Sequence, residues 1–283
     1  MSATRKIPAF GRRRSRQSGA PPPQPDHGPF APPPEGSVYE GEDSYDDGTM
    51  KMGGRNVQFL ENPRFVDAHQ AGLNAGLEFK WPGTENVIDM PWRVHIACWA
   101  ASHAVRIPGD LVECGVHTGG LSLAVCRYVD FNQTGKRFWL FDTFSGIPED
   151  QMGEDERPHR GFENETYYRE DSFDRAQRNF APYPRAHLVR GRVPDILGSV
   201  DIEAVSYLSL DMNIAAPEVA ALEFFWPKLS VGAIVLLDDY GWTHYRPQKV
   251  ALDAFASQQN VEIATLPTGQ GLLIKPASRE AVP

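Results

Sequence analysis

Two short apolar runs that end in carboxylates constrain this chain more than any other feature. Residues 208–211 and 233–239 are both rich in strand-forming side chains, and a segment with helical spacing lies between them. Ligands of an open parallel sheet bind outside the carboxyl ends of its strands, so we expect Asp211, Asp238 and Asp239 to meet at one mouth. Three carboxylates there repel one another and call for a cation, and all-oxygen ligands favour Mg2+. The sequence therefore predicts a magnesium site with these three ligands.

Strand and helix patterns alternate through the rest of the chain. Strands are expected at residues 110–114, 138–142, 187–189 and 205–211, and a closing hairpin at 261–266 and 271–274. This alternation predicts an α/β fold, with a mostly parallel sheet that helices cover on both faces.

A helix is also expected before the first of these strands, because Pro91 suits a first helical turn. Its residues with helical spacing are Trp92, Ile96, Trp99 and His103, and we expect this face to pack on the sheet with His103 as its polar edge. Arg93 and His95 fall on other faces and receive no role.

Charge and cysteine content narrow the class of protein. Lys and Arg number 28 against 37 Asp and Glu, for a net charge of -9, which argues against a nucleic-acid partner. No apolar run approaches the roughly 20 residues that span a bilayer, so neither a membrane partner nor a secretory signal is expected. Cys98, Cys114 and Cys126 form no metal-binding pair and are predicted to be free thiols in a reducing compartment. A cytoplasmic location follows.

Composition also divides the chain. Residues 1–35 hold nine of the 24 prolines and several arginines, and an acidic stretch follows; such a segment cannot bury enough apolar surface to offset its ordering entropy. We predict a disordered tail at 1–48, a helical region at 49–105, and a catalytic domain at 106–278. Residues 149–168 are highly charged and long for a connection, so they are predicted to be either a lid or a disordered insertion.

A glycine-rich turn follows the first strand of the catalytic domain. Gly115 and Gly119 lie in this turn and allow close approach of a ligand, and Asp142, which ends the next strand, can accept hydrogen bonds from a ribose diol. NAD(P) and S-adenosylmethionine both present that diol. The latter is favoured because position 117 is His rather than Gly, because Glu113 can anchor the amino end of the ligand through the backbone, and because hydride transfer has no evident use for a carboxylate cluster.

Four stretches carry a resemblance to a known family, and their ordered combination is specific. They are Val112-Glu113-Cys114-Gly115-Val116-His117-Thr118-Gly119-Gly120-Leu121-Ser122, Phe141-Asp142-Thr143-Phe144-Ser145-Gly146-Ile147-Pro148, Phe225-Trp226-Pro227-Lys228-Leu229-Ser230-Val231-Gly232 with Asp238-Asp239-Tyr240-Gly241, and Gln248-Lys249-Val250. From about residue 62 to 275 the chain resembles the macrocin O-methyltransferase family, which acts on sugar hydroxyls of macrolide and aminocoumarin antibiotics.

This resemblance implies a class I methyltransferase fold, a Rossmann-like, doubly wound seven-stranded sheet whose last strand is antiparallel. It implies S-adenosylmethionine as the methyl donor and Mg2+ as a second cofactor. The implied metal ligands are Asp211, Asp238 and Asp239, and the implied cofactor-binding residues are Glu113, Gly115, Gly119, Ser122, Asp142, Gly191 and Arg192, with the last two near adenine.

The chain departs from the family pattern after Asp211. Family members commonly continue with Gly-Asp and then Tyr-Glu-Ser, whereas this chain has Met212-Asn213 and then Ala215-Ala216-Pro217. The three nominal metal ligands are kept, but the wall beside them has lost a charge and several hydrogen-bonding groups. The departure bears on the identity of the substrate and on the affinity for the metal.

The prediction is an O-methyltransferase that acts on a hydroxyl of a sugar or of a sugar-containing small molecule, with Asp211 as the proton acceptor. A homo-oligomer is compatible with the sequence. Two alternatives stay open: a catechol-type O-methyltransferase that takes aromatic diols, and a cofactor-binding module without turnover, which the Ala215-Ala216 run permits. A dehydrogenase is a more distant third. His117, His159 and His244 are further candidates for substrate contacts, or are ordinary loop histidines.

Overall fold

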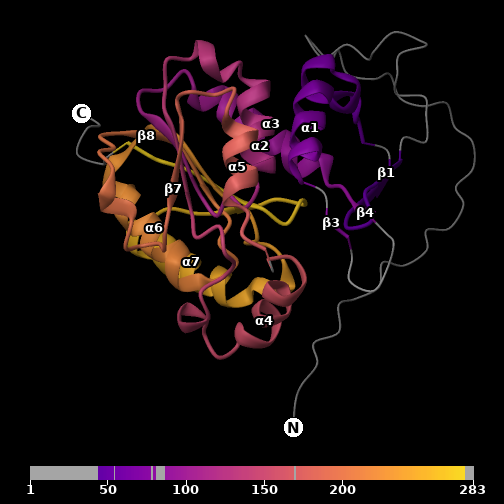
Figure 1. The fold of residues 1–283 in the computed structure, drawn as a ribbon. Helices are drawn as coiled ribbons and strands as arrows, with labels where there is room; N and C mark the ends of the chain where they lie inside the picture. Colours follow the sequence, from indigo (N-terminus) through magenta and orange to yellow (C-terminus); the bar gives the residue numbers. More distant parts are fainter. Residues whose placement is uncertain (1–43, 54, 78, 81–86, 169, 278–283) are drawn as a thin grey trace, which may run out of the picture. The chain divides into compact units, whose positions relative to one another are not determined.

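A seven-stranded sheet organises the structure, a computed structural model that describes residues 44–53, 55–77, 79–80, 87–168 and 170–277. The strand order is β10-β11-β9-β8-β5-β6-β7, and Figure 1 labels β7 and β8 of this sheet. The bounds are β5 Asp110–Cys114, β6 Phe138–Asp142, β7 Ala186–Arg190, β8 Val205–Leu210, β9 Leu229–Leu237, β10 Ala264–Thr265 and β11 Gly271–Ile274. Strands β5 to β9 pair in parallel, and β11, the last strand, runs antiparallel to β9. The predicted α/β architecture is confirmed.

Helices cover both faces of the sheet because successive strand residues point to opposite sides. Leu111 packs in a core with α1, α2, α3 and α5, whereas its neighbour Val112 packs in a second core with α6 and α7. The helices are α1 Pro63–Ala75, α2 Pro91–Ala104, α3 Gly120–Tyr128, α4 Arg157–Thr166, α5 Phe173–Phe180, α6 Ala215–Phe225 and α7 Arg246–Gln259. The helical region predicted at 49–105 thus contributes α1 and α2 to the core of the sheet.

Short elements complete the described fold. Two small antiparallel pairs are β1 Ser44–Asp46 with β2 Lys51–Gly53, and β3 Phe79–Lys80 with β4 Val87–Ile88. Short 3-10 helices are η1 Gln58–Glu61, η2 Phe131–Gln133, η3 Glu149–Gln151, η4 Leu197–Ser199, η5 Trp226–Lys228 and η6 Thr243–Tyr245.

The N-terminal tail is described only at its end. Residues 1–43 of the segment predicted as disordered, with its proline-rich and arginine-rich part, lie outside the described residues. Residues 44–48 differ from that prediction, because Ser44–Asp46 form β1. Tyr45 is buried with its ring edge against Trp92, and its hydroxyl accepts a hydrogen bond from the Trp92 amide at 3.3 Å. This contact fixes the strand to the first turn of α2.

The predicted inward face of α2 is wrong in part. Ile96 packs against the core and His103 is exposed, as expected of the polar edge, but Trp99 is 46% exposed. The small residues Ala97, Cys98 and Ala101 are buried instead. Small side chains let α2 approach α3 and the sheet closely, so helical spacing of the large residues pointed to the wrong side. The three cysteines are buried free thiols, as expected. Within the described ranges, no helix has the length and apolarity that a membrane crossing requires.

Candidate active site

The turn after β5 requires glycine at two positions. Gly115 has φ +92°, and a Cβ there would lie 1.9 Å from the Asp211 carbonyl oxygen. Gly119 has φ +88°, and a Cβ there would lie 2.2 Å from the ring of Phe180. Both positions need glycine for their positive φ and for a close approach of the chain to itself. Gly115 thereby brings the turn against the end of β8, where Asp211 follows.

Asp142 clamps this turn to the end of β6. Its Oδ2 accepts hydrogen bonds from the amides of Val116 and His117, the second at 2.7 Å, and its Oδ1 accepts from the Phe144 amide. Backbone donors thus already engage both oxygens of the carboxylate that the sequence assigns to a ribose. The same carboxylate lies on the wall of a pocket.

This pocket opens over the carboxyl ends of β5, β6 and β8. Its lining includes Gly115, His117, Asp142, Tyr168, Gly191 and Asp211. Burial lowers the pKa of His117 against the smaller opposing effect of Asp142, so a neutral imidazole faces the pocket. Of the three candidate histidines, His117 lines this pocket, while His159 and His244 lie near each other with their rings 5.3 Å apart.

Four of the predicted cofactor residues are absent from the pocket lining. Glu113 is 3% exposed, and its carboxylate accepts a hydrogen bond from the Ser122 hydroxyl; burial raises the pKa of Glu113 to about 8. Gly119 faces Phe180. Arg192 is at the surface and forms an ion pair with Asp150 at 2.7 Å. The roles of these four in cofactor binding stay predictions.

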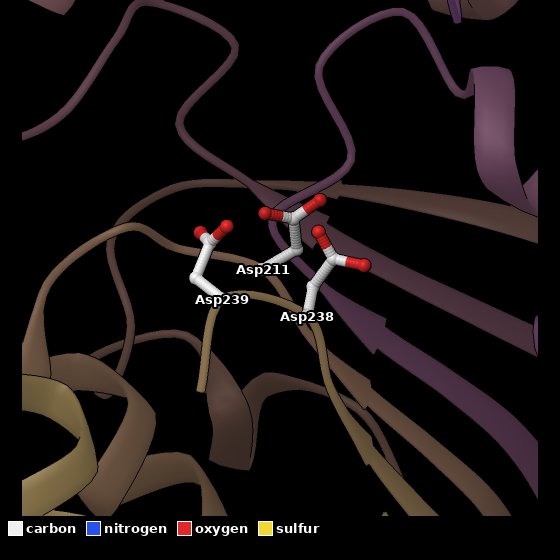
Figure 2. A group of neighbouring side chains, drawn as sticks. All are labelled: Asp211, Asp238 and Asp239. Atoms are coloured by element: carbon white, nitrogen blue, oxygen red, sulfur yellow. The ribbon is translucent and has the colours of Figure 1, made fainter. Parts of the chain in front are cut away.

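The three acids at the strand ends do come together. Asp211 follows β8, and Asp238 and Asp239 follow β9; each offers a carboxylate oxygen, and these oxygens lie within 4.8 Å of one another. Figure 2 shows the three carboxylates gathered above the ends of the strands. Parallel strands β8 and β9 pair Leu210 with Leu237, so the residues that follow them emerge side by side.

The electrostatics of this cluster fit a divalent cation. Burial raises the pKa of Asp211 and of Asp239 well above the ordinary range, and the charge of Asp238 adds to this against the opposing effect of Arg93. The Oδ2 atom of Asp239 is buried and has no hydrogen-bond partner among the described residues. An all-oxygen set with an unpartnered carboxylate oxygen has the chemistry that Mg2+ prefers.

Arg93 is the site residue that sequence reasoning missed. It lies in the first turn of α2, where its Nε donates to Asp238 Oδ1 at 2.7 Å and its Nη2 donates to Asp238 Oδ2 and, at 3.2 Å, to Asp211. Burial lowers the pKa of Arg93, but the attraction of Asp238, Asp211 and Asp239 outweighs it and raises that pKa. A positively charged side chain in the first turn of a helix is unfavourable because it opposes the helix dipole. This unfavourable position was the one signal in the sequence that an acidic partner of Arg93 lies nearby.

The candidate lid is an ordered helix over the described range. Within α4, Asn164 donates to the Ile147 carbonyl and accepts from the Ile147 amide, both at 2.8 Å. Arg160 is 2% exposed, pairs with Glu163 at 2.8 Å and lies 3.8 Å from the ring centroid of Tyr245. Since Arg160 and Asn164 are four residues apart, one face of α4 contacts both the pocket wall and the segment after β9.

Residues 212–217, which depart from the family pattern, form hydrogen bonds with residues of the candidate lid. Asn213 has φ +64°, and its amide donates to the Tyr168 hydroxyl at 3.3 Å. Glu156 is buried, and its carboxylate accepts a hydrogen bond from the Ala215 amide at 2.8 Å. A carboxylate from outside α6 thus satisfies an amide of the first turn of α6, next to the run that lacks polar side chains.

Comparisons with known proteins find one matching family and several related methyltransferases. The model of the Macrocin-O-methyltransferase (TylF) family matches residues 95–266. The chain is 28% identical to a demethyldecarbamoylnovobiocin O-methyltransferase of Streptomyces niveus, over 55% of the chain and 61% of that protein. It is 31% identical to 8-demethyl-8-(2,3-dimethoxy-alpha-L-rhamnosyl)-tetracenomycin-C 4'-O-methyltransferase of Streptomyces olivaceus, over 47% of the chain and 54% of that protein. The matched part is thus less than two thirds of both relatives.

A solved structure shows the same fold. The O-methyltransferase NovP superposes with a TM-score of 0.59 at 24% sequence identity, over 70% of the chain and 85% of that protein. The predicted class I methyltransferase architecture is confirmed at the level of the fold.

Proposed function

Because the chain belongs to the macrocin O-methyltransferase family, we propose that it transfers a methyl group from S-adenosylmethionine to a hydroxyl of a sugar-containing small molecule. One observation carries the proposal: Asp211 belongs both to the pocket lining and to the acid cluster. A donor in the pocket and an acceptor hydroxyl at the cluster would therefore lie next to each other. The tetracenomycin relative, whose name gives a rhamnosyl-bearing substrate and a 4'-O position, supports this class of acceptor.

The cofactor is assigned to the pocket over the Gly115 turn. S-adenosylmethionine, when bound, supplies an electrophilic methyl group. Gly115 keeps the turn free of a side chain where β8 ends, and the amides of Val116 and His117 are fixed by Asp142. Asp142 lies on the pocket wall and is the proposed partner of the ribose hydroxyls. These residues position the donor, and positioning of two reactants accounts for a large share of such an acceleration.

The acceptor hydroxyl is assigned to the acid cluster. A divalent cation such as Mg2+, when bound, supplies positive charge that lowers the pKa of an oxygen beside it. Asp211, Asp238 and Asp239 form the cluster to which we assign this ion. The Asp211 side chain is 24% exposed and lines the pocket, so we assign to it the acceptance of the proton from the hydroxyl.

The experiment compares methyl transfer by wild type and Asp211→Asn, with labelled S-adenosylmethionine and a panel of glycosylated and catechol acceptors. We expect transfer to a glycosylated acceptor, and a loss of about a hundredfold or more in Asp211→Asn, the usual size of a lost acid–base group. Cofactor affinity should change by less than about threefold. Asp201→Asn is the control, since Asp201 is exposed and precedes β8 at its other end.

Three results would contradict the proposal. Full transfer by Asp211→Asn would remove Asp211 from the chemistry. Transfer to catechols alone would point to the aromatic-diol alternative. Cofactor binding with no methyl loss to any acceptor would point to a binding module without turnover.

A further inference from the structure

Arg93 and Asp238 form a pair with two-point geometry inside the acid cluster. Arg93 donates to both carboxylate oxygens of Asp238, through Nε and Nη2. Gln270 donates to Asp238 Oδ1 at 3.2 Å and to the Arg93 carbonyl at 3.4 Å. The Asp238 side chain is 0% exposed. A bidentate arginine–carboxylate pair is among the strongest charge-assisted contacts in proteins, so Asp238 is engaged at both oxygens.

The other two acids are engaged far less. Asp239 Oδ2 is buried with no partner among the described residues. Asp211 receives one hydrogen bond from Arg93, at 3.2 Å, and its side chain is 24% exposed. The oxygens that can still take a ligand therefore belong to Asp211 and Asp239, whose carboxylates lie beside that of Asp238 in Figure 2.

The net charge of the cluster also indicates that Arg93 and one divalent cation bind there together. When all three carboxylates are ionised, as they must be to bind a cation, they carry -3, and the guanidinium of Arg93 brings the sum to -2. A buried charge is tolerated only when it is compensated. The residual charge of -2 equals the charge that one divalent cation neutralises.

We propose that Arg93 is the resident counter-cation of the acid cluster, which holds Asp238 and leaves the divalent ion to Asp211 and Asp239. This inference rests on the divalent ion of the proposed function. It assigns Asp238 a different role from the one expected of it, because Asp238 anchors an arginine instead of the ion. Arg93 is thus a positioning residue that sets the affinity of the cluster for the ion.

The test measures ion binding to the full chain without donor or acceptor, by calorimetry with Mg2+ and by spin resonance with Mn2+. Arg93→Gln removes a unit charge from the cluster and frees Asp238, so the ion should bind about tenfold tighter or more, by Coulomb's law at a water-like dielectric. Arg93→Lys keeps the charge and should stay within about threefold of wild type. Asp239→Asn should weaken binding by about tenfold or more.

Thermal unfolding supplies an independent readout. Removal of one partner of a buried pair is strongly destabilising, so Arg93→Gln without ion should unfold about 10 °C lower, and Mg2+ should restore most of this loss. The control is Arg127→Gln, which breaks an exposed pair with Asp67 far from the cluster. Its Tm should change by a degree or two, with no response to Mg2+.

Two results would overturn the inference. The first is ion binding by Arg93→Gln that is about tenfold weaker than in wild type. If Arg93→Gln does not fold, the same result for Arg93→Lys would overturn the inference. The second is an Asp239→Asn protein with wild-type ion affinity. Neither result bears on methyl transfer, because the measurements contain no acceptor; failure of the proposed function would appear in the transfer assay alone.

Discussion

The buried pair of Glu113 and Ser122 offers a sharp test of a predicted cofactor residue. Glu113 lies in β5, is 3% exposed and accepts a hydrogen bond from the Ser122 hydroxyl. Burial raises its pKa from 4.5 to about 8. The folded chain therefore holds this proton more tightly than the unfolded chain does. The resulting stability is fully present below about pH 4.5 and is lost as the pH rises through about 8.

The perturbation is Glu113→Gln, which keeps the size and the acceptor oxygen of the protonated acid and cannot ionise. One unit of pKa corresponds to about 1.4 kcal/mol. Between pH 5 and pH 8 the wild type should lose about 3 kcal/mol from this group, and the variant should lose none of it. The free energy of unfolding of Glu113→Gln relative to wild type should therefore rise by about 3 kcal/mol across this interval.

The assay is urea denaturation of both proteins at pH 5, 6.5 and 8. A difference between the two proteins that does not change with pH would refute the reasoning, since it would mean that Glu113 has an ordinary pKa. The affinity of both proteins for S-adenosylmethionine distinguishes two possible roles of Glu113. A loss beyond about tenfold in the variant would make Glu113 a ligand anchor, while a change within about threefold would make it a support for its own loop.

Two further predictions concern contacts that support the turn after β5 and the helix α4. Gly119→Ala should lower the free energy of unfolding by about 2–4 kcal/mol, because a left-handed φ strains alanine and its Cβ would overlap Phe180. Urea denaturation measures this loss, and the control is Gly135→Ala, where φ is +74° and a Cβ would have no atom within 4 Å. The control should cost about 1 kcal/mol. Equal costs for the two variants would mean that the overlap with Phe180 does not contribute. Asn164→Ala loses both hydrogen bonds to Ile147 and should cost about 1–3 kcal/mol. It should also speed hydrogen exchange in residues 157–166 and weaken cofactor binding severalfold; unchanged exchange there would mean that other contacts hold α4.

The sequence predicted correctly those features that follow from local strand patterns and from the direction of parallel strands. Strand patterns located β5 at 110–114 and β6 at 138–142, because a strand of a parallel sheet is a short apolar run. The convergence of Asp211 with Asp238 was predictable for the same reason. Parallel strands end at one edge of the sheet, so acids that follow adjacent strands must meet.

Sequence reasoning failed where several faces compete for one helix. The large residues of α2 pointed to one inward face, yet Trp99 is exposed and Ala97 and Cys98 are buried. Helical spacing gives the angle between side chains but not the distance at which a helix packs. That distance depends on the neighbours, and here the small side chains made the closest contact.

The sequence by itself determined the order of strands and helices, the glycine turn and the meeting of three acids, because these follow from local backbone preferences and from the direction of parallel strands. Only the tertiary structure decided which charges share a site. It brought Arg93 of α2 onto Asp238, turned Glu113 toward Ser122 and seated the α4 residue Asn164 on Ile147. These contacts join residues on different elements of the fold. Their geometry depends on the packing of whole elements, which no local pattern records.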